Sequence, residues 1–473
     1  MASKNEFIRE YVRAVSEGYA AVFAGAGLSR SSGYIDWKEL VRPLALDIGL
    51  DVDKEHDLIA VAQYFQNERG TRSAINQRII NEFTRNVSDN DNIKILTRLP
   101  ITTYWTTNYD ELLEENLKAN NRKADVKKTQ KSLATNIYDR DAIVYKMHGD
   151  VRDPDDAVIT KDDYELYGYE RPLFRTALQG DLISKTFLFV GFSFEDPNLD
   201  YVLSQIRVLL GESEREHYCF FQKVVQKVNE SETDYLYNLA RQDLRIKDLR
   251  RYGIQAVVLD SYDEITGILQ QIERGYLLKN VFISGSISKF DSTWTPQTVN
   301  EFTHKLAGRL VSEDYKIVSG FGFGIGSTIV NGALEEIMKS KYKHVDEHLC
   351  LRPFPQQSSG GISMNELKTK YREDMLEQAG VAVFIFGNKE AEDGSIIEAD
   401  GMIEEFEIAK LQKKVIIPVG STGGTALTIF NEVKRNIEDY PYLTKFLDEL
   451  SQPSDVNSLI ELIYRVIQDQ QII

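Results

Sequence analysis

Short apolar runs alternate with amphipathic stretches through the first half of the chain. Most of these runs are uninterrupted by polar residues, which is typical of strands buried on both faces of a parallel sheet. The stretches between them, such as DLIAVAQYFQNERG and SAINQRIINEFTRN, repeat with the period of an amphipathic helix. Strands that alternate with helices predict a parallel sheet covered on both faces. The predicted strands are AAVFAG (20–25), ITTYWTTN (101–108), AIVYKMHG (142–149), TFLFVGFS (186–193), HYCFFQKV (217–224) and IQAVVLD (254–260).

The same pattern begins again after the helical segment YDEITGILQQIERGYLL. Further strands are predicted at NVFISGS (280–286), at the start of YKIVSGFGFGIGS (315–327), at VAVFIFG (381–387) and at KKVIIPVG (413–420). Each half therefore opens with a strand that runs into a turn of small residues. The sequence predicts two Rossmann-like α/β domains, 1–278 and 279–473, with the boundary near Lys279.

The composition of the chain argues against several classes of protein. The chain has 473 residues, and 73 acidic against 56 basic residues give a net charge of −17, which argues against a broad nucleic-acid-binding or anionic membrane-binding surface. Cys219 and Cys350 are far apart and form no C-x-x-C motif, so neither a disulfide framework nor a cysteine zinc site is expected. The first residues lack the apolar core of a signal peptide, and no apolar run approaches the ~20 residues of a membrane span. We expect a cytoplasmic protein.

Polar and glycine residues gather at four strand ends of the first domain, where open α/β sheets bind ligands. The four segments are GAGLS (25–29), TTNYD (106–110), HGD (148–150) and GFSFEDPN (191–198). Gly25 and Gly27 would let the backbone approach a pyrophosphate at a helix N-terminus, and Ser29 adds a hydroxyl donor. A histidine at a strand end, His148, is suited to act as a general base near neutral pH.

Each polar residue also has a structural interpretation. Asn108 either faces a ligand or caps the helix that follows, and Asp110 either joins the site or complements the helix dipole. Asp196 and Asn198 fit the capping of the helix after their strand. An isolated histidine is more often structural than catalytic. The catalytic interpretation of His148 therefore depends on the polar residues at the neighbouring strand ends.

Together, the four segments resemble the NAD-binding motifs of sirtuins, which read G-A-G-I-S, T-Q-N-I-D, H-G and G-T-S in the same order. The resemblance implies that His148 is the base and that Asn108 and Asp110 lie near the nicotinamide and its ribose. Ser193 would meet a phosphate or the adenine ribose. The resemblance also includes Asp36, and the residues it assigns to NAD are Gly25, Ala26, Gly27, Ser29, Asp36, Asp110 and Ser193.

The departures from the sirtuin pattern narrow the implied reaction. Thr107 stands in place of the glutamine of T-Q-N-I-D, and the segment after HGD lacks the paired cysteines of the sirtuin zinc module. Peptide deacylation is therefore less well supported than cleavage of the nicotinamide–ribose bond of NAD, which needs no metal. Two alternatives stay open: an NAD-dependent protein deacylase and a nucleotide-binding scaffold without catalysis.

The second domain carries its own strand-end features: SGSIS (284–288), the glycine-rich SGFGFGIGS (319–327) and DGMIEEFEIAK (400–410). The glycine-rich turn would wrap an anion at a helix N-terminus, or it is simply a flexible turn. Arg372 and Lys389 could pair with phosphates, although a lone arginine is more often on a solvated helix face. No histidine or nucleophile lies at these strand ends, so we expect binding without catalysis.

This half is similar to the SLOG group of nucleotide-sensing domains, and the two halves together resemble the ThsA family of Thoeris anti-phage effectors. That resemblance implies that the second domain binds a cyclic ADP-ribose isomer made by a TIR-domain partner. Binding would activate NAD cleavage, and NAD depletion would stop phage growth. It also implies a homo-oligomer, taken here as a tetramer. The positions implied for the activator are Gly285, Ser286, Gly322, Gly324, Arg372, Lys389 and Glu404.

Overall fold

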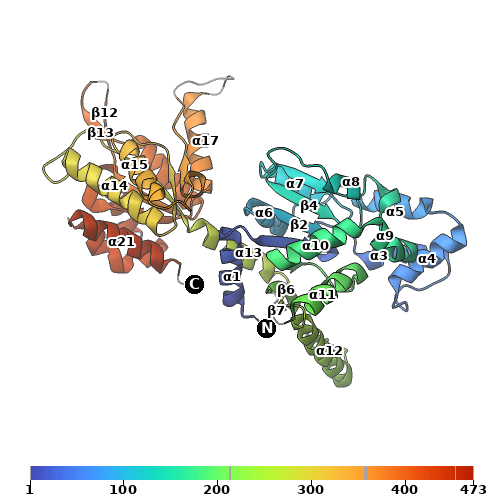
Figure 1. Cartoon of the computed structure of the whole chain (residues 1–473). Helices are drawn as coiled ribbons and strands as arrows, with labels where there is room; N and C mark the ends of the chain where they lie inside the picture. The colour runs from blue at the N-terminus through green and yellow to red at the C-terminus, as the bar shows by residue number, and fades with distance from the viewer. Residues whose placement is uncertain are drawn as a thin grey trace. The chain divides into compact units, whose positions relative to one another are not determined.

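The chain forms two compact units, residues 1–273 and 274–473, each built around its own parallel sheet (Figure 1). The computed structural model describes residues 2–211, 215–355, 361, 363–391, 393–452 and 454–471. The boundary between the units falls within helix α13, a few residues before the first strand of the second sheet.

The first unit contains a seven-stranded sheet whose order is β3-β4-β2-β1-β5-β6-β7, with every neighbouring pair parallel. Its strands are β1 (Ala20–Ala24), β2 (Thr103–Thr106), β3 (Ala124–Lys127), β4 (Ala142–Lys146), β5 (Thr186–Val190), β6 (His217–Gln222) and β7 (Ile254–Leu259). Its helices are α1 (Lys4–Ser16), α2 (Ala26–Arg30), α3 (Trp37–Asp47), α4 (Leu58–Arg69), α5 (Ser73–Phe83), α6 (Asp91–Arg98), α7 (Leu112–Ala119), α8 (Gln130–Leu133), α9 (Lys161–Glu170), α10 (Pro172–Ser184), α11 (Pro197–Leu210), α12 (Glu232–Arg250) and α13 (Glu264–Leu277), the last continuing into the second unit.

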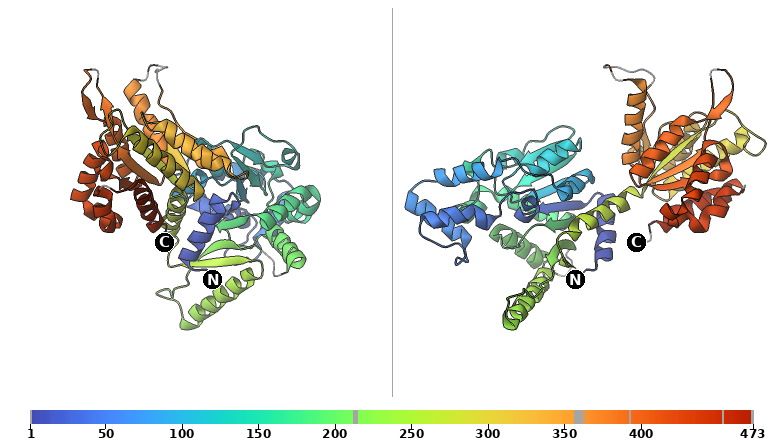
Figure 2. Two further views of the ribbon diagram at one scale, coloured as in Figure 1. Left: turned by 60° about the vertical axis from the view of Figure 1, so that its left-hand side comes forward. Right: turned by 180° about the vertical axis from the view of Figure 1, so that it is seen from behind.

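Every residue of the central strands β1, β2 and β5 is buried. A strand has side chains on both faces, so burial at every position requires helices on both faces of the sheet, an arrangement that can be followed in Figure 2. The uninterrupted apolar runs in the sequence are explained by this double coverage. The predicted parallel α/β fold of the first domain is confirmed.

The structure corrects two features of the predicted sheet. Strand β3, with the sequence ADVK, was not predicted, because it is a short edge strand that alternates buried and half-buried residues. All six predicted strands of this domain also end one to three residues earlier than expected: β4, for example, ends at Lys146, and Gly149 follows in a turn at φ +90°. The polar residues at the strand ends therefore lie in loops beyond the last paired residues.

The second unit contains a five-stranded parallel sheet in the order β10-β9-β8-β11-β14. Its strands are β8 (Asn280–Ser286), β9 (Lys316–Ser319), β10 (Leu349–Leu351), β11 (Val381–Phe386) and β14 (Val415–Pro418). Its helices are α14 (Pro296–Ser312), α15 (Gly326–Met338), α16 (Val345–His348), α17 (Met364–Glu377), α18 (Asp400–Leu411), α19 (Gly424–Arg435), α20 (Leu447–Ser451) and α21 (Val456–Asp469). The second predicted Rossmann-like domain is confirmed as well.

A two-stranded antiparallel hairpin, β12 (Asn388–Glu390) and β13 (Ile396–Glu398), follows β11 and was not predicted. It places Lys389 in the middle of a short strand, paired with Ile397, just after the end of β11. In the described part of the chain, no helix combines the length and the apolar character that crossing a membrane requires.

Candidate functional site

The four polar segments of the first unit follow four strands that are neighbours in the sheet, in the order β4-β2-β1-β5. All four strands are parallel, so their carboxyl ends lie at one edge of the sheet. The chain passes from β1 to β2 on one side and later to β5 on the other. This reversal makes the carboxyl end of β1 the topological switch point, where ligands bind in open α/β sheets.

A hydrogen-bonded network joins the ends of β1 and β2. The amide nitrogen of Asn108 donates to the Ser29 hydroxyl at 2.9 Å and to the carbonyl oxygen of Gly25 at 3.1 Å. The Ser29 hydroxyl in turn donates to Asp110 Oδ2 at 2.8 Å. These two bonds use both protons of the Asn108 side-chain nitrogen, so its carbonyl oxygen Oδ1 is the atom left to contact a ligand.

Asn108 does not cap the helix that follows it. Helix α7 begins at Leu112, and its first backbone amide donates to Asp110 Oδ1 at 3.1 Å. Asp110 thus accepts from the helix with one carboxylate oxygen and from the Ser29 hydroxyl with the other, and its assignment to NAD stays a prediction. Burial raises the pKa of Asp110, against the opposing effect of the nearby Lys146 ammonium.

A fully buried ammonium group, which the sequence analysis missed, contacts the backbone of Asp110. Lys146 Nζ lies 2.7 Å from Asp150 Oδ2 and 3.4 Å from Glu114 Oε1, and it donates to the carbonyl oxygens of Tyr109 and Asp110 at 3.1 and 2.5 Å. Burial alone would lower the pKa of Lys146, but the surrounding carboxylates outweigh it and hold the pKa above its ordinary value. Burial raises the pKa of Glu114 to about 7. The available signal was a lysine inside an apolar central strand, which indicates a buried ion pair.

His148 lies two residues beyond the end of β4, with a side chain only 4% exposed. Its Nε2 atom is 3.1 Å from Asp196 Oδ2 but is not aligned for a hydrogen bond with it. The imidazole ring also packs against the rings of Tyr164 and Tyr167, with centroids 5.4 and 6.3 Å away. The structure therefore places the Asp196 carboxylate next to this histidine, although the sequence had assigned Asp196 only to helix capping.

The glycines of the GAGLS loop lie in tight backbone packing against the end of β5. A Cβ atom on Gly25 would lie 2.4 Å from the carbonyl oxygen of Gly191, and one on Gly27 would lie 2.9 Å from Gly191 Cα. The Gly27 amide also donates to the carbonyl oxygen of Gly191 at 2.9 Å. Contact between two strand ends thus requires these glycines, whether or not a pyrophosphate also approaches the loop.

The described contacts do not connect two other predicted NAD-binding residues to the Asn108 network. Asp36 caps helix α3, with Oδ1 accepting from the Glu39 amide at 3.0 Å, and Ser193 is exposed, with its carbonyl oxygen held by Arg245 at 2.7 Å. Ala26 is half-buried as the first residue of α2. The assignment of these three residues to NAD stays a prediction.

Arg372 and Glu404, both predicted to bind the activator in the second unit, contact each other. Arg372 Nη1 lies 2.6 Å from Glu404 Oε2, and its guanidinium stacks over the Phe354 ring at 5.0 Å. The neighbouring Glu405 is buried, lies 3.5 Å from Arg372 Nε and accepts from the Ser284 hydroxyl at 2.6 Å. Burial raises the pKa of Glu405 to about 7. Arg372 thus lies in a partly buried acidic cluster, and the solvated-face interpretation is wrong.

The glycine-rich turn packs directly on the end of β8. A Cβ atom on Gly322 would lie 2.0 Å from the carbonyl oxygen of Gly285, and one on Gly324, at φ +78°, would lie 2.1 Å from the carbonyl oxygen of Ile287. Close backbone contact therefore accounts for the regular glycine spacing. Ser286, at the same strand end, donates to the Asn388 carbonyl oxygen at 3.2 Å.

Lys389 pairs with Asp400, the first residue of α18. The neighbouring Asn388 binds the loop after β8, because its Oδ1 accepts from the amides of Ser288 and Lys289 at 2.7 and 2.9 Å. The sequence analysis did not single out Asn388. Its side-chain contacts hold the hairpin against the end of the first strand of this sheet.

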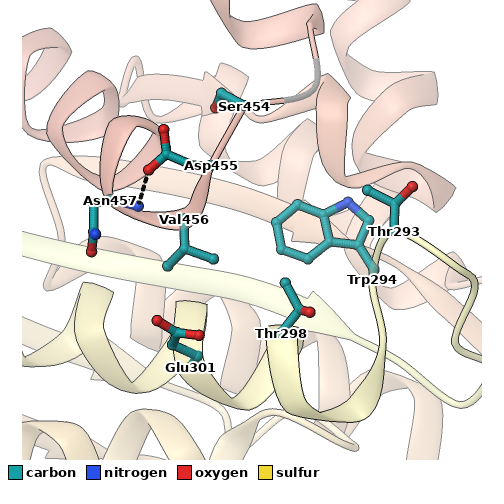
Figure 3. Close-up of a pocket in the computed structure, with 8 residues that line it drawn as sticks. All are labelled: Thr293, Trp294, Thr298, Glu301, Ser454, Asp455, Val456 and Asn457. Atoms are coloured by element: carbon teal, nitrogen blue, oxygen red, sulfur yellow. Dashed lines mark hydrogen bonds between the residues drawn. The ribbon is translucent and has the colours of Figure 1, made fainter.

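A cavity of about 340 Å³ lies elsewhere in the second unit, where α14 and α21 begin (Figure 3). None of the residues predicted to bind the activator lines it. Within the described ranges, no group of three or more His, Cys, Asp or Glu side chains is arranged to hold a metal ion. The lining residues are Thr293, Trp294, Thr298, Glu301, Ser454, Asp455, Val456 and Asn457.

Comparison with known proteins now identifies both halves. Residues 102–244 match the family model of a SIR2-like domain, and residues 264–470 match the Sir2- and TIR-associating SLOG family. A protein named NAD(+) hydrolase ThsA from Bacillus cereus (strain MSX-D12) is 46% identical over 99% of this chain and 98% of its own length. The chain belongs to the ThsA family. Proteins with the same name from Acinetobacter baumannii (strain 532279) and Enterococcus faecium are 44% and 41% identical, over 92% and 99% of this chain and 91% and 99% of their own lengths.

Membership of the ThsA family confirms the resemblance drawn from the strand-end motifs, including the combination of a sirtuin-like and a SLOG domain. Since these relatives span nearly all of this chain, the two-domain architecture is common to the family and to this protein. The residue assignments within each site remain predictions.

Proposed function

We propose that the chain is an NAD+ glycohydrolase whose activity is switched on by a cyclic ADP-ribose isomer bound to the second unit. The product would be ADP-ribose and nicotinamide, and NAD depletion would serve anti-phage defence in the cytoplasm. This assignment extends the name shared by its relatives, NAD(+) hydrolase ThsA, to this chain. The activator would come from a TIR-domain partner protein, and the active assembly would be a homo-oligomer, for which we propose a tetramer.

The observation that carries the proposal is the network of Asn108, Ser29 and Asp110, with His148 in the loop that follows the adjacent strand β4. Hydrogen bonds to Gly25 and Ser29 fix the orientation of the Asn108 amide, and a buried carboxylate fixes the Ser29 hydroxyl. Side chains that are locked in this way are preorganised to position a reacting group, which lowers the entropic part of the barrier.

The chemistry follows from the groups available. Asn108 Oδ1 would orient a water or a ribose hydroxyl, and His148 would accept the proton as water attacks C1′ of the ribose. The bond from C1′ to the nicotinamide nitrogen breaks, and its electron pair leaves with nicotinamide. The developing positive charge on the ribose makes this an oxocarbenium-like transition state that requires no metal. Attack by a ribose or adenine atom of the same molecule would give a cyclic product instead.

In the second unit, the acidic cluster around Arg372 supports a nucleotide site that is not catalytic. A phosphate could replace Glu404 at the guanidinium, because arginine binds either carboxylates or phosphates through two parallel hydrogen bonds. Glu404 would then be free to accept from ribose hydroxyls, and Lys389 could exchange Asp400 for a second phosphate. Gly285, Ser286, Gly322 and Gly324 would form the backbone wall of this site.

The decisive experiment measures nicotinamide release from NAD+ by the purified full chain, with and without a panel of cyclic ADP-ribose isomers. We expect one isomer to stimulate release, and Asn108→Ala and His148→Ala each to reduce the stimulated rate about 100-fold or more. His304→Ala is the matched control and should retain activity, because His304 is a half-buried histidine of the second unit that pairs with Glu335.

The same assay separates the competing functions. Turnover that requires an acyl-lysine peptide would identify a deacylase, and tight NAD+ binding without turnover under every condition would identify a scaffold. Full activity of His148→Ala would refute its assignment as the base.

A further inference from the structure

Asp196, the carboxylate that faces His148, makes more contacts than the capping of a helix requires. Asp196 Oδ1 accepts from the backbone amides of Asn198 and Leu199 at 2.9 and 3.0 Å, which completes the cap of helix α11. A cap needs only this one oxygen, and asparagine or serine would supply it equally well. The second oxygen, Oδ2, is turned to His148 Nε2 at 3.1 Å, and the Tyr164 hydroxyl lies 3.4 Å from the same atom.

Asp196 is held as an anion at this position. Burial by itself would favour the neutral acid, but His148 and the two helix amides hold the pKa of Asp196 below its ordinary value. The N-terminal end of α11 adds the favourable dipole for a negative charge. His148 Nε2 is not aligned for a hydrogen bond with any group of the described structure, but it lies 3.1 Å from Asp196 Oδ2, close enough for its proton to be directed to that carboxylate.

Other charged and titratable groups around the imidazole come from α9 and its C-terminal end. Tyr164 and Tyr167 contact the ring face to edge, and burial raises the pKa of Tyr164 well above its ordinary value, so it stays neutral. The Arg171 guanidinium lies 3.5 Å from the Met147 carbonyl oxygen, one residue before the histidine. Asp196 is therefore the anionic group directed at the ring among these neighbours.

We propose that Asp196 is a positioning residue that orients His148 with a proton on Nε2 and leaves Nδ1 to act as the base. The inference rests on the proposed NAD+ cleavage and deepens it. As water attacks C1′, its proton passes to Nδ1, while the Nε2 proton stays between the ring and the carboxylate. Asp196 takes no proton; it stabilises the imidazolium that forms, as the buried aspartate does in serine-protease triads.

Asp196→Asn tests this role cleanly, because the asparagine oxygen keeps the cap of α11 and only the charge is removed. Asp455→Asn is the matched control: Asp455 caps α21 through Oδ1 to the amides of Asn457 and Ser458, both at 3.1 Å, and no histidine faces it in the described structure. Nicotinamide release is measured from about pH 5 to about pH 9, the range in which imidazoles titrate, with NAD+ alone and with the panel of cyclic ADP-ribose isomers.

We expect Asp196→Asn to reduce kcat/KM about 100-fold and to move the acidic limb of the pH profile to lower pH, because the imidazolium loses its counter-charge. Asp455→Asn should stay within about twofold of the parent chain. An unchanged acidic limb and near-parental activity in Asp196→Asn, with His148→Ala inactive, would overturn the positioning role and leave the proposed function standing. A fully active His148→Ala would instead remove the base assignment itself.

A second measurement does not depend on activity or on the folding of a variant. Nitrogen-15 NMR of the parent chain labelled at its six histidines, with the His148 signals assigned by their loss in His148→Ala, reports which ring nitrogen carries the proton. The Nε2–H tautomer at neutral pH supports the proposal. The Nδ1–H tautomer would overturn it, whatever the activity assay shows.

Discussion

The buried ammonium of Lys146 should be one of the strongest single contributors to the stability of the first unit. It lies 2.7 Å from the buried carboxylate of Asp150 and donates to the carbonyl oxygens of Tyr109 and Asp110. Lys146→Met keeps an unbranched side chain of similar length and removes the charge. Removing one partner of a buried ion pair costs about 3–5 kcal/mol, because the other charge stays buried without compensation. That is a large share of the ~5–15 kcal/mol that stabilises a typical domain.

Urea unfolding followed by tryptophan fluorescence measures this loss. The chain has three tryptophans, of which Trp37 and Trp105 lie in the first unit and Trp294 in the second. In a Trp294→Phe background, the indole signal reports on the first unit alone, which avoids a mixture of two domain transitions. The expected result is a decrease of about 3–5 kcal/mol in the free energy of unfolding for Lys146→Met.

Two further variants make this result interpretable. Asp150→Asn added to Lys146→Met removes the uncompensated carboxylate and should recover part of the loss. Arg13→Ala breaks an exposed pair between α1 and Glu17, the residue that follows the helix, and should leave the free energy of unfolding nearly unchanged. A change below about 1 kcal/mol in Lys146→Met, or no recovery in the double variant, would refute the assigned importance of this ion pair.

Three other outcomes are expected. Gly25→Ala places a Cβ atom 2.4 Å from the carbonyl oxygen of Gly191 and should destabilise the protein by about 1–3 kcal/mol even without NAD+. Gly180→Ala, where the added Cβ atom would meet open space, should not destabilise it. Equal melting temperatures of the two variants would show that Gly25 is not needed for packing. Arg372→Ala should abolish stimulation by cyclic ADP-ribose isomers while the first unit keeps its unfolding transition, and an unchanged activator titration would exclude this residue from the sensor. Burial raises the pKa of Glu405 from 4.5 to about 7, so its contribution to stability is complete below about pH 4.5 and is lost as the pH rises through about 7. Melting curves of Glu405→Gln should therefore depend less on pH across that interval, and a dependence equal to that of the parent chain would contradict the raised pKa.

The architecture of both units could be predicted from the chain itself. Buried parallel strands require apolar side chains on both faces, so β1, β5 and β11 appear in the sequence as almost uninterrupted apolar runs. Local periodicity is enough to locate such elements. The edge strands β3 and β10 and the β12–β13 hairpin carry no comparable signal, because their residues are only partly buried and long-range pairing alone makes them strands.

The candidate site shows the same division. Residue types and their order identified Asn108 and His148 as candidates, because polar residues gather at four strand ends and follow the order of the sirtuin motifs. No local pattern could show that the Asn108 amide would be held by Ser29, about eighty positions earlier in the chain, or that Lys146 would donate to the Asp110 carbonyl oxygen as a buried cation.

The clearest contrast is at Asp196 and at the glycine turns. From the sequence, Asp196 was a helix cap and Gly25 a phosphate-loop glycine; in the structure, Asp196 also faces His148 and Gly25 also packs on the end of β5. Strand order β4-β2-β1-β5 creates both contacts, because it brings segments separated by tens of residues to one edge of the sheet. Local sequence thus determined the elements and the chemical groups at their ends, whereas the long-range order of the strands decided which of those groups meet.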